Sequence, residues 1–196
     1  MAITTRNSEA TKGRLKAASA VEFAEHGVAG ARVERIASAA QANKQLIYAY
    51  FGSKDALFNA VLAEHCGALA EAVPFEAEDI PGYVGRLFDY AVEHPEIHRL
   101  VSWAALERPD AIAEFERSSY GAKLAGIGEA QRAGRIDPSF APSDLLALVM
   151  SIAAAWFNAS EAIRRYNSED PMAPRRLAQF RRAAVEATSR LVAQQN

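Results

Sequence analysis

Apolar residues recur along most of the chain with the period of amphipathic helices, whereas the alternating pattern of half-buried strands is almost absent. In the segment 33–40 the apolar positions follow the spacing i, i+3, i+4 and i+7, and the last periodic segment carries its apolar stripe from Leu177 to Leu191. Glycines and prolines separate about nine such segments. The pattern predicts an all-α protein.

The predicted helices form a small group followed by a larger one. The small group consists of a first helix over residues 8–26, a short second helix over 33–40 and a third over 43–50. Ser53 is a good N-cap for a longer fourth helix that links the two groups. Five more helices follow a connector that is acidic and contains proline. We therefore expect three parts, namely an N-terminal domain over residues 1–54, a linking helix over about 54–72, and a larger domain over 73–196.

The charge of the chain is divided unevenly between these parts. The whole chain has a net charge of −2 at pH 7, but residues 1–54 hold eight Lys and Arg against four Glu. That balance of +4 leaves −6 for the rest of the chain. A DNA-binding surface needs a local basic patch rather than a basic protein, because only the patch meets phosphates. The uneven charge therefore indicates nucleic acid as the partner of the N-terminal part.

The second and third helices have the proportions of a helix-turn-helix, a motif whose second helix enters the major groove of DNA. Residues at the exposed start of that helix can reach guanine, adenine and a thymine methyl group, and they are Lys44, Gln45 and Leu46. Further residues are expected to hold phosphates, and they are Tyr48, Tyr50 and Lys54. For each residue taken singly, the alternative is ordinary packing or a solvated charge.

The string GVAGARVERIASAAQANKQLIYAYFGSKDALFNAVL, residues 27–62, resembles the N-terminal signature of the TetR family of bacterial transcription regulators. The matching positions are Gly27, Ile36, Ala37, Ala40, Ile47, Tyr48, Phe51, Ser53, Lys54 and Leu57. The rest of the chain resembles the family only in the number and length of its helices. The resemblance implies a homodimeric repressor that grips double-stranded operator DNA and releases it when a small-molecule inducer enters the C-terminal domain.

Two positions depart from the family pattern. The glycine that is usual in the turn is replaced by Gln41, so a positive φ at this position would strain the backbone. The threonine common at the start of the second helix is replaced by Arg32, which removes a capping hydroxyl but adds a cation that can contact phosphate. These changes affect the turn and the operator sequence more than the DNA-binding role.

The inducer site that the resemblance implies would need apolar walls and a few polar anchors. The C-terminal part offers a stock of aromatic side chains, although each of them can equally be a packing residue of the core. The candidate ligand-binding residues are Phe88, Trp103, Glu107, Phe115, Tyr120, Trp156 and Asn158. We expect an apolar or aromatic inducer and no cofactor.

The two last long helices are expected to form the dimer, because they are apolar around more of their circumference than one domain needs to bury. Two such helices from each protomer would make a four-helix bundle across a two-fold axis. The candidate interface residues are Leu145, Leu148, Val149, Ile152, Phe180, Ala184, Thr188 and Leu191.

Two other classes of function were weighed against this one. A helical enzyme or carrier whose head binds a protein partner predicts a catalytic set, but the sequence shows neither a Ser/His/Asp set nor a phosphate-binding loop. A DNA-organising protein without a ligand would share the head but would need no cavity. We therefore expect no enzyme activity, and we expect DNA binding to weaken steeply with salt.

Several features bound the remaining chemistry. His94 and His98 have a spacing that suits metal ligands, but Pro95 between them indicates a helix boundary, so no metal site is expected. Cys66 is the only cysteine, which excludes an intrachain disulfide, and no signal peptide is evident. The apolar run 145–157 is too short to cross a bilayer. The expected location is therefore the cytoplasm, with no membrane partner.

Overall fold

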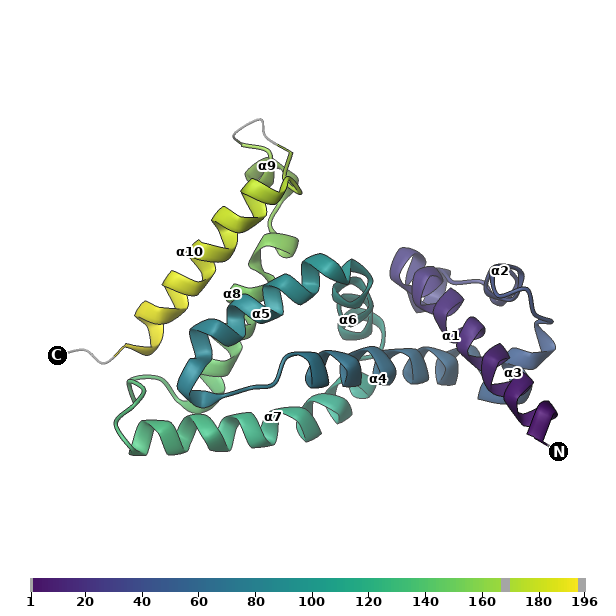
Figure 1. Ribbon diagram of the computed structural model, residues 1–196, viewed down its shortest axis with the longest axis horizontal. Coiled ribbons are helices and arrows are strands. Elements are labelled where there is room, and N and C mark those ends of the chain that lie inside the picture. The colour runs from purple at the N-terminus through teal and green to yellow at the C-terminus, as the bar shows by residue number, and fades with distance from the viewer. Residues whose placement is uncertain (1, 167–169, 194–196) are drawn as a thin grey trace. The chain divides into compact units, whose positions relative to one another are not determined.

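The computed structural model describes residues 2–166 and 170–193, and the side chains within them apart from those of 2–7, 112–116 and 118. Every regular element in this part is helical (Figure 1), and nine α-helices have seven residues or more, which confirms the all-α prediction. The elements are α1 (Ala2–Gly30), α2 (Val33–Ala39), α3 (Gln45–Phe51), α4 (Lys54–Ala72), η1 (Ala77–Asp79), α5 (Ile80–Glu93), α6 (Pro95–Glu107), α7 (Pro109–Arg132), α8 (Pro142–Asn158), α9 (Glu161–Arg164) and α10 (Pro174–Val192).

Several helix ends that were predicted from glycine, proline and serine are confirmed. α1 loses helical geometry at Gly27, where φ is 68° and ψ is −179°, a conformation that glycine adopts without steric cost. Ser53 caps α4, because its Oγ accepts a hydrogen bond of 3.0 Å from the backbone N–H three residues later. α5 ends before His94 and α6 begins at Pro95, as expected. The short helix α9 was not predicted.

The chain forms two compact units. The first consists of the residues up to Leu69 together with Pro95–Glu116, and the second consists of Ala70–His94 together with the residues from Arg117 onward. The first unit therefore includes α6, which lies within the range expected for the second domain. The two units do not follow the expected boundary at residue 73, and the functional division at that boundary stays a proposal.

The core of the first unit is built from α1, α2, α3, α4 and α6. Phe23 of α1 and Phe58 of α4 meet edge to face with their ring centroids 5.1 Å apart, and both are fully buried. Leu100 and Ala104 of α6 lie in the same apolar cluster, which also holds Ile36 of α2. α6, a segment distant in sequence, therefore packs on α1 and completes the core that the helix-turn-helix shares.

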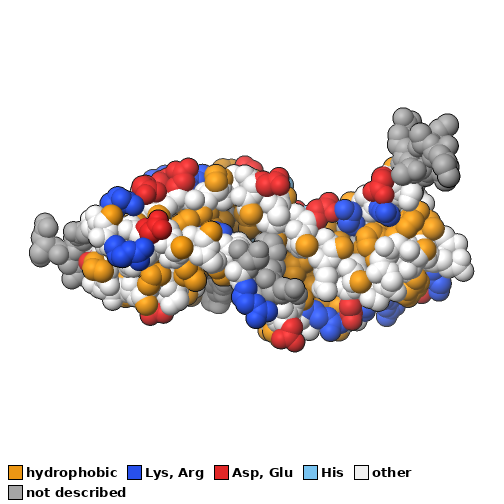
Figure 2. Space-filling model, turned by 90° about the horizontal axis from the view of Figure 1, so that it is seen from below, with side chains coloured by type: hydrophobic (Ala, Val, Ile, Leu, Met, Phe, Trp, Pro, Cys, Tyr) orange, Lys and Arg blue, Asp and Glu red, His pale blue; other side chains and the backbone are white. Residues whose placement is uncertain are grey.

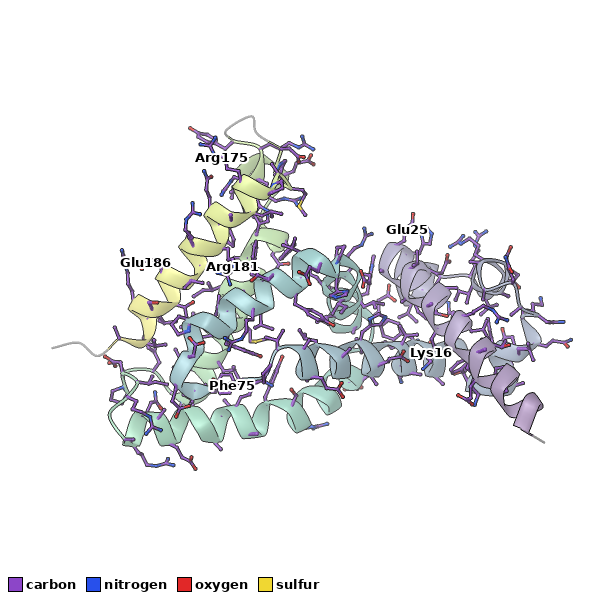
Figure 3. All side chains as sticks on the ribbon, viewed as in Figure 1. Lys16, Glu25, Phe75, Arg175, Arg181 and Glu186 are labelled. Carbon is purple, nitrogen blue, oxygen red and sulfur yellow. The ribbon has the colours of Figure 1, made fainter. Side chains whose placement is uncertain are left out.

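The second unit is held together mainly by α5, α8 and α10, which pack against one another. Arg181 of α10 points toward α5 (Figure 3), where its Nε donates to both carboxylate oxygens of Asp89 at 2.8 Å. Gly85 of α5 allows this close approach, because a Cβ there would lie 2.8 Å from Arg181 Nη2 and 3.2 Å from a methyl group of Val185. An ion pair and a close helix crossing thus fix α10 on α5.

No single helix of the described part is both long enough and apolar enough to cross a membrane, although the interrupted pair formed by α4 and the segment Ala77–Glu93 meets that test of length and composition when taken together.

Candidate nucleic-acid interface

The turn between α2 and α3 has a strained residue at the position where the sequence departs from the family. Gln41 has a φ of 51° and is the only residue other than glycine with a positive φ in the described part of the chain. The position where the family usually has glycine thus does adopt a positive φ, which is the case in which the sequence indicated strain. The turn is closed by a hydrogen bond of 2.9 Å from Ala42 N to Ala37 O, and Asn43 Oδ1 caps α3 by accepting from Gln45 N at 2.9 Å.

Glu22 of α1 organises the start of α2, a role that the sequence did not reveal. Its Oε1 accepts hydrogen bonds of 2.8 Å from the backbone N–H of Arg32 and from Arg35 Nε. Burial raises the pKa of Glu22, but the hydrogen bonds from these two partners outweigh burial and hold the pKa below its ordinary value. The carboxylate is thus charged at neutral pH. It supplies the cap that the Arg32 side chain does not provide.

The residues of α3 divide into an exposed set and a buried set. Lys44, Gln45 and Tyr48 are exposed, with half of Tyr48 open to solvent, whereas Ile47 is fully buried. Leu46 is partly buried against the core of the first unit. Lys44 and Gln45 lie at the start of α3 and Tyr48 lies at its middle. The N-terminal residues of a recognition helix are those that contact base edges.

Two cations close to α3 already have partners within the chain. Lys44 Nζ lies 3.2 Å from an oxygen of Glu34 on α2, and both side chains are more than half exposed. Lys12 Nζ lies 5.4 Å from the ring centroid of Tyr50, which is partly buried in the core cluster. Tyr50 thus serves packing in this structure. The surface pair of Lys44 is weak enough for phosphates or bases to replace.

Lys54 forms hydrogen bonds within the first unit. Its Nζ donates to the backbone carbonyl oxygens of Ala31 at 3.1 Å and Ala29 at 3.5 Å. These bonds tie the first turn of α4 to the connection between α1 and α2. A substitution of Lys54 therefore changes the stability of the head as well as any contact with phosphate.

Two residues expected in the inducer site lie instead in the first unit, beside the end of α1. The indole Nε1 of Trp103 donates to Ala24 O at 3.3 Å, and Glu107 Oε2 accepts from Ala29 N at 2.9 Å. Side-chain atoms of both residues also lie within 3.0 Å of the place that a Cβ of Gly27 would occupy. The partners of these two hydrogen bonds are 79 and 78 residues apart, so the periodicity of the sequence could not indicate the contact.

The other candidate ligand-binding residues lie in the second unit, with one exception. Phe88 and Trp156 share an apolar cluster with Leu177, and each is only 1% exposed. Trp156 also donates to Pro171 O at 3.2 Å. Tyr120 is half-buried on α7 and Asn158 is exposed at the end of α8. The side chain of Phe115 lies outside the described residues.

Several of the candidate interface residues are buried within the protomer itself. Four of them are buried within a single chain, and they are Leu145, Val149, Ala184 and Thr188. Phe180 stacks between Phe88 and Trp156, at centroid distances of 5.5 and 5.1 Å. Leu148 is 41% exposed, and Ile152 and Leu191 are partly exposed. Because α8 is apolar on both faces, the sequence pattern did not show which of its apolar residues are buried within the protomer and which are exposed.

Basic and acidic side chains both occur on the face of the molecule shown in Figure 2, interspersed with apolar ones. Two arginines of the first unit that were not among the predicted DNA-binding residues, Arg14 and Arg35, form hydrogen bonds within that unit. Arg14 Nε donates to Ala40 O at 3.1 Å, at the end of α2. Arg35 is the partner of Glu22 described above. These contacts position the helix-turn-helix. A sequence pattern does not show which basic residues will bond to the ends of other helices.

Comparison with known proteins agrees with this geometry. Residues 15–61 match the family model described as bacterial regulatory proteins of the tetR family, and residues 79–190 match that of the tetracyclin repressor-like C-terminal domain. The HTH-type transcriptional repressor SCO4008 of Streptomyces coelicolor is 44% identical over 151 residues, which cover 76% of this chain and 79% of the relative.

Solved structures show the same fold. SCO4942 of Streptomyces coelicolor has a TM-score of 0.82 and 38% identity, over 93% of this chain and 98% of its own. FadR of Bacillus subtilis, solved in complex with stearoyl-CoA, has a TM-score of 0.68 at 14% identity, over 92% of this chain and 98% of its own, and shares the fold alone. Since the two family models together cover the helix-turn-helix and most of the second unit, the chain belongs to the TetR family of bacterial regulatory proteins, and it is a DNA-binding transcriptional repressor rather than an enzyme.

Proposed function

We propose that two copies of the chain bind a palindromic operator, with the start of α3 of each copy in the major groove. The observation that carries this proposal is the division of α3, whose buried Ile47 anchors the helix while Lys44 and Gln45 project from its exposed start and Tyr48 from its middle. Lys44 suits guanine and Gln45 suits adenine. A protein that binds operator DNA acts where the chromosome lies, in the cytoplasm of a bacterium.

Phosphate contacts would come from residues that flank α3. The Arg32 side chain is exposed and forms no ion pair within the described residues. Tyr48 offers a hydroxyl from the exposed side of α3. Lys54 lies at the first turn of α4, where the helix N-terminus adds its own positive potential. Such contacts set the position of α3 on the duplex but carry no sequence information.

The test is selection of binding sequences from a random duplex library, followed by fluorescence anisotropy with the selected duplex. We expect an inverted repeat and a steep loss of affinity between 50 and 200 mM salt, by a factor on the order of 10³ if about six phosphates are contacted. Lys44→Ala should change the sequence preference, whereas Arg165→Ala, which removes a positive charge from the second unit, should not. Binding without preference for any sequence would favour a DNA-organising protein instead.

The dimer is proposed to use the exposed sides of α8 and α10 rather than their buried sides. Between its two ends, α8 has exposed or partly exposed residues that are small or apolar, including Ala147, Leu148, Ser151, Ile152 and Ala155. On α10, Ala183 and Ala187 are exposed one turn apart. Small side chains on two neighbouring helices allow the helices of a second copy to approach closely.

The inducer is proposed to bind in the second unit and to weaken operator affinity. Trp103 and Glu107 form hydrogen bonds with α1 and are therefore left out of the proposed site. The site is proposed to lie among those parts of α5, α7 and α8 that belong to the second unit. An inducer that favours the state unable to bind DNA by about 1–3 kcal/mol would weaken binding by roughly 5- to 150-fold. Because α6 bonds directly to the end of α1, a displacement of α6 is a direct way to move the helix-turn-helix.

A further inference from the structure

The inner side of α7 in the second unit carries a lysine among apolar residues. Ile127 and Ala130 are fully buried on this side. A Cβ at Gly126 would lie 3.8 Å from Phe75 Cε1 and from Ala77 Cβ, and Figure 3 shows Phe75 beside α7. Lys123 lies three and four residues before Gly126 and Ile127, and therefore on the same side of the helix, where it is half-buried.

The ammonium group of Lys123 is held by neutral groups. Its Nζ donates to Ser119 O at 3.1 Å and to Ser119 Oγ at 2.9 Å, and it lies 5.6 Å from the ring centroid of Tyr120. No carboxylate of the described residues forms an ion pair with it. By contrast, Lys12 and Lys44 both pair with a glutamate. Among the described side chains, Lys123 therefore has a positive charge and an N–H donor that neither of these hydrogen bonds uses, and no negatively charged group pairs with it.

Burial acts on this group in the direction expected for an uncompensated cation. Desolvation lowers the pKa of Lys123 below its ordinary value. The lowered pKa indicates that the positive charge is destabilised in its surroundings, and a negative charge brought beside it would offset that cost. Ser119 strengthens the case, because its hydroxyl accepts from Lys123 and its own O–H remains able to donate to an anion.

One turn along α7 from this cation, at Gly126, the neighbouring segment is aromatic. The Phe75 and Tyr83 rings meet edge to face with centroids 5.1 Å apart. Tyr83 is only 3% exposed, and burial raises its pKa to about 12, so its phenol stays neutral. The inner side of α7 packs on the segment that holds Phe75, so Lys123 and the hydroxyl of Ser119 lie on the same side of α7 as a neutral, apolar surface.

We infer that Lys123 and Ser119 anchor the inducer, and that the inducer is a monocarboxylate with an apolar body rather than a neutral compound. This inference rests on the proposed ligand-responsive function. The carboxylate would accept the third N–H of Lys123 and the O–H of Ser119, and the apolar body would lie against the aromatic wall. Charge-assisted hydrogen bonds of this kind give a carboxylate a large advantage over its uncharged amide.

The test is calorimetric titration of the full-length protein with cinnamate and decanoate, each beside its primary amide. We expect each acid to bind about 10- to 100-fold more tightly than its amide. Lys123→Met should remove this advantage and leave amide binding unchanged, whereas Lys123→Arg should keep most of it. Arg132→Met, which removes an exposed charge at the other end of α7, is the matched control and should bind as the wild type does.

A second measurement follows the pKa of Lys123 in the wild-type protein and uses a substitution only to assign the signal. NMR of the Cε signals of ¹³C-labelled lysines, with the Lys123 signal assigned by its loss in Lys123→Arg, reports the pKa of the unmodified side chain. We expect this pKa to be the lowest of the lysines that the structure describes and to rise when cinnamate is added. Equal binding of acids and amides, no binding of either acid, or an unperturbed pKa would overturn the inference.

The carboxylate site and the proposed function can fail independently of each other. If a neutral compound releases the operator equally from the wild type and from Lys123→Met, the ligand-responsive repressor stands and the carboxylate site is wrong. If the wild type binds no preferred duplex, the proposed operator function fails, while the titrations still report on Lys123 by themselves.

Discussion

The indole nitrogen of Trp103 donates a hydrogen bond to the carbonyl oxygen of Ala24, so α6 satisfies an acceptor in the last turn of α1. Arg99 Nε donates to the same oxygen at 2.7 Å. Four carbonyls at the end of any helix lack partners within the helix, and here two side chains from α6 serve one of them. The end of α1 is therefore fixed by tertiary contacts, and side chains of α6 leave little space beside Gly27.

Gly27→Ala should lower the free energy of unfolding by about 1–3 kcal/mol, because the new methyl group meets both a positive φ and the side chains of Trp103 and Glu107. Urea unfolding followed by circular dichroism measures the change. Gly13→Ala is the control, since Gly13 lies in α1 with open space around it, and alanine there should stabilise the protein by up to about 1 kcal/mol. Equal effects of both substitutions would show that the contact is not tight.

Glu22→Gln should destabilise the first unit by about 1.5–3 kcal/mol at pH 7, because the hydrogen bonds from Arg35 and the N–H of Arg32 lose their charge. The pKa of Glu22 is lowered in the folded state. Its contribution is therefore complete above the ordinary glutamate pKa of about 4.5 and is lost as the pH falls through the lower folded value. Unfolding curves at pH 7 and at successively lower pH should show the wild type converging on the variant.

The exposed neighbour Glu25 supplies the control for that experiment. Its side chain is 64% exposed, whereas that of Glu22 is 10% exposed. Glu25→Gln should leave stability at pH 7 within about 0.5 kcal/mol of the wild type. A pH-independent difference between the wild type and Glu22→Gln would rule out the charged carboxylate as the stabilising species.

Tyr48→Ala and Tyr50→Ala should separate binding from folding. Tyr48 is half exposed, so its replacement should weaken operator binding about 10-fold or more while the unfolding free energy changes by less than about 0.5 kcal/mol. Tyr50 packs into the core cluster beneath Lys12, so its replacement should cost on the order of 3 kcal/mol of stability. Anisotropy and urea unfolding on both variants make the comparison. The reverse pattern would mean that α3 is rotated in solution.

Gln41→Gly should stabilise the protein by about 1 kcal/mol, because glycine adopts the positive φ of 51° without strain. Ala49→Gly in the exposed middle of α3 should instead cost about 1 kcal/mol, since glycine loses more backbone entropy in a helix. Thermal unfolding of the two variants shows whether the strain at Gln41 is real. A loss of stability in Gln41→Gly would place the turn in another conformation.

Leu148→Glu should give folded monomers if α8 forms the proposed dimer, because Leu148 is 41% exposed on the protomer. Val149→Glu should unfold or aggregate the protein, since Val149 is fully buried within the protomer and an unpaired charge there is costly. Size-exclusion chromatography with light scattering distinguishes these outcomes. A Leu148→Glu protein with the mass of a dimer would move the interface to another surface.

The sequence pattern predicted features that depend on neighbours along the chain. The helices, the break at Gly27, the cap at Ser53 and the boundary at Pro95 all follow from local propensity. The family signature showed that a positive φ at Gln41 would strain the backbone, but it did not decide whether this position adopts one. The division of α3 into exposed Lys44 and buried Ile47 followed from helical period as well.

Features that depend on contacts across the fold could not be predicted. The carboxylate of Glu22 that caps α2 belongs to α1, and the contacts of Trp103 and Glu107 with α1 join segments that no periodicity relates. Lys54 matched the family signature, yet the carbonyl oxygens that it bonds were not visible in that signature. Polar side chains that bond distant backbone atoms carry no repeating signal.

The burial of Leu100 and Ala104 in one core with Phe23 has a consequence for protein engineering. Chimeric regulators are often imagined as an exchange of DNA-reading heads at a single junction, but a head cut from this chain after α4 would leave an apolar face of α1 uncovered. A transplant that keeps its own α6, with junctions on both sides of residues 95–107, would carry a complete core to its new host. The exchangeable cassette in this protein is therefore discontinuous in sequence.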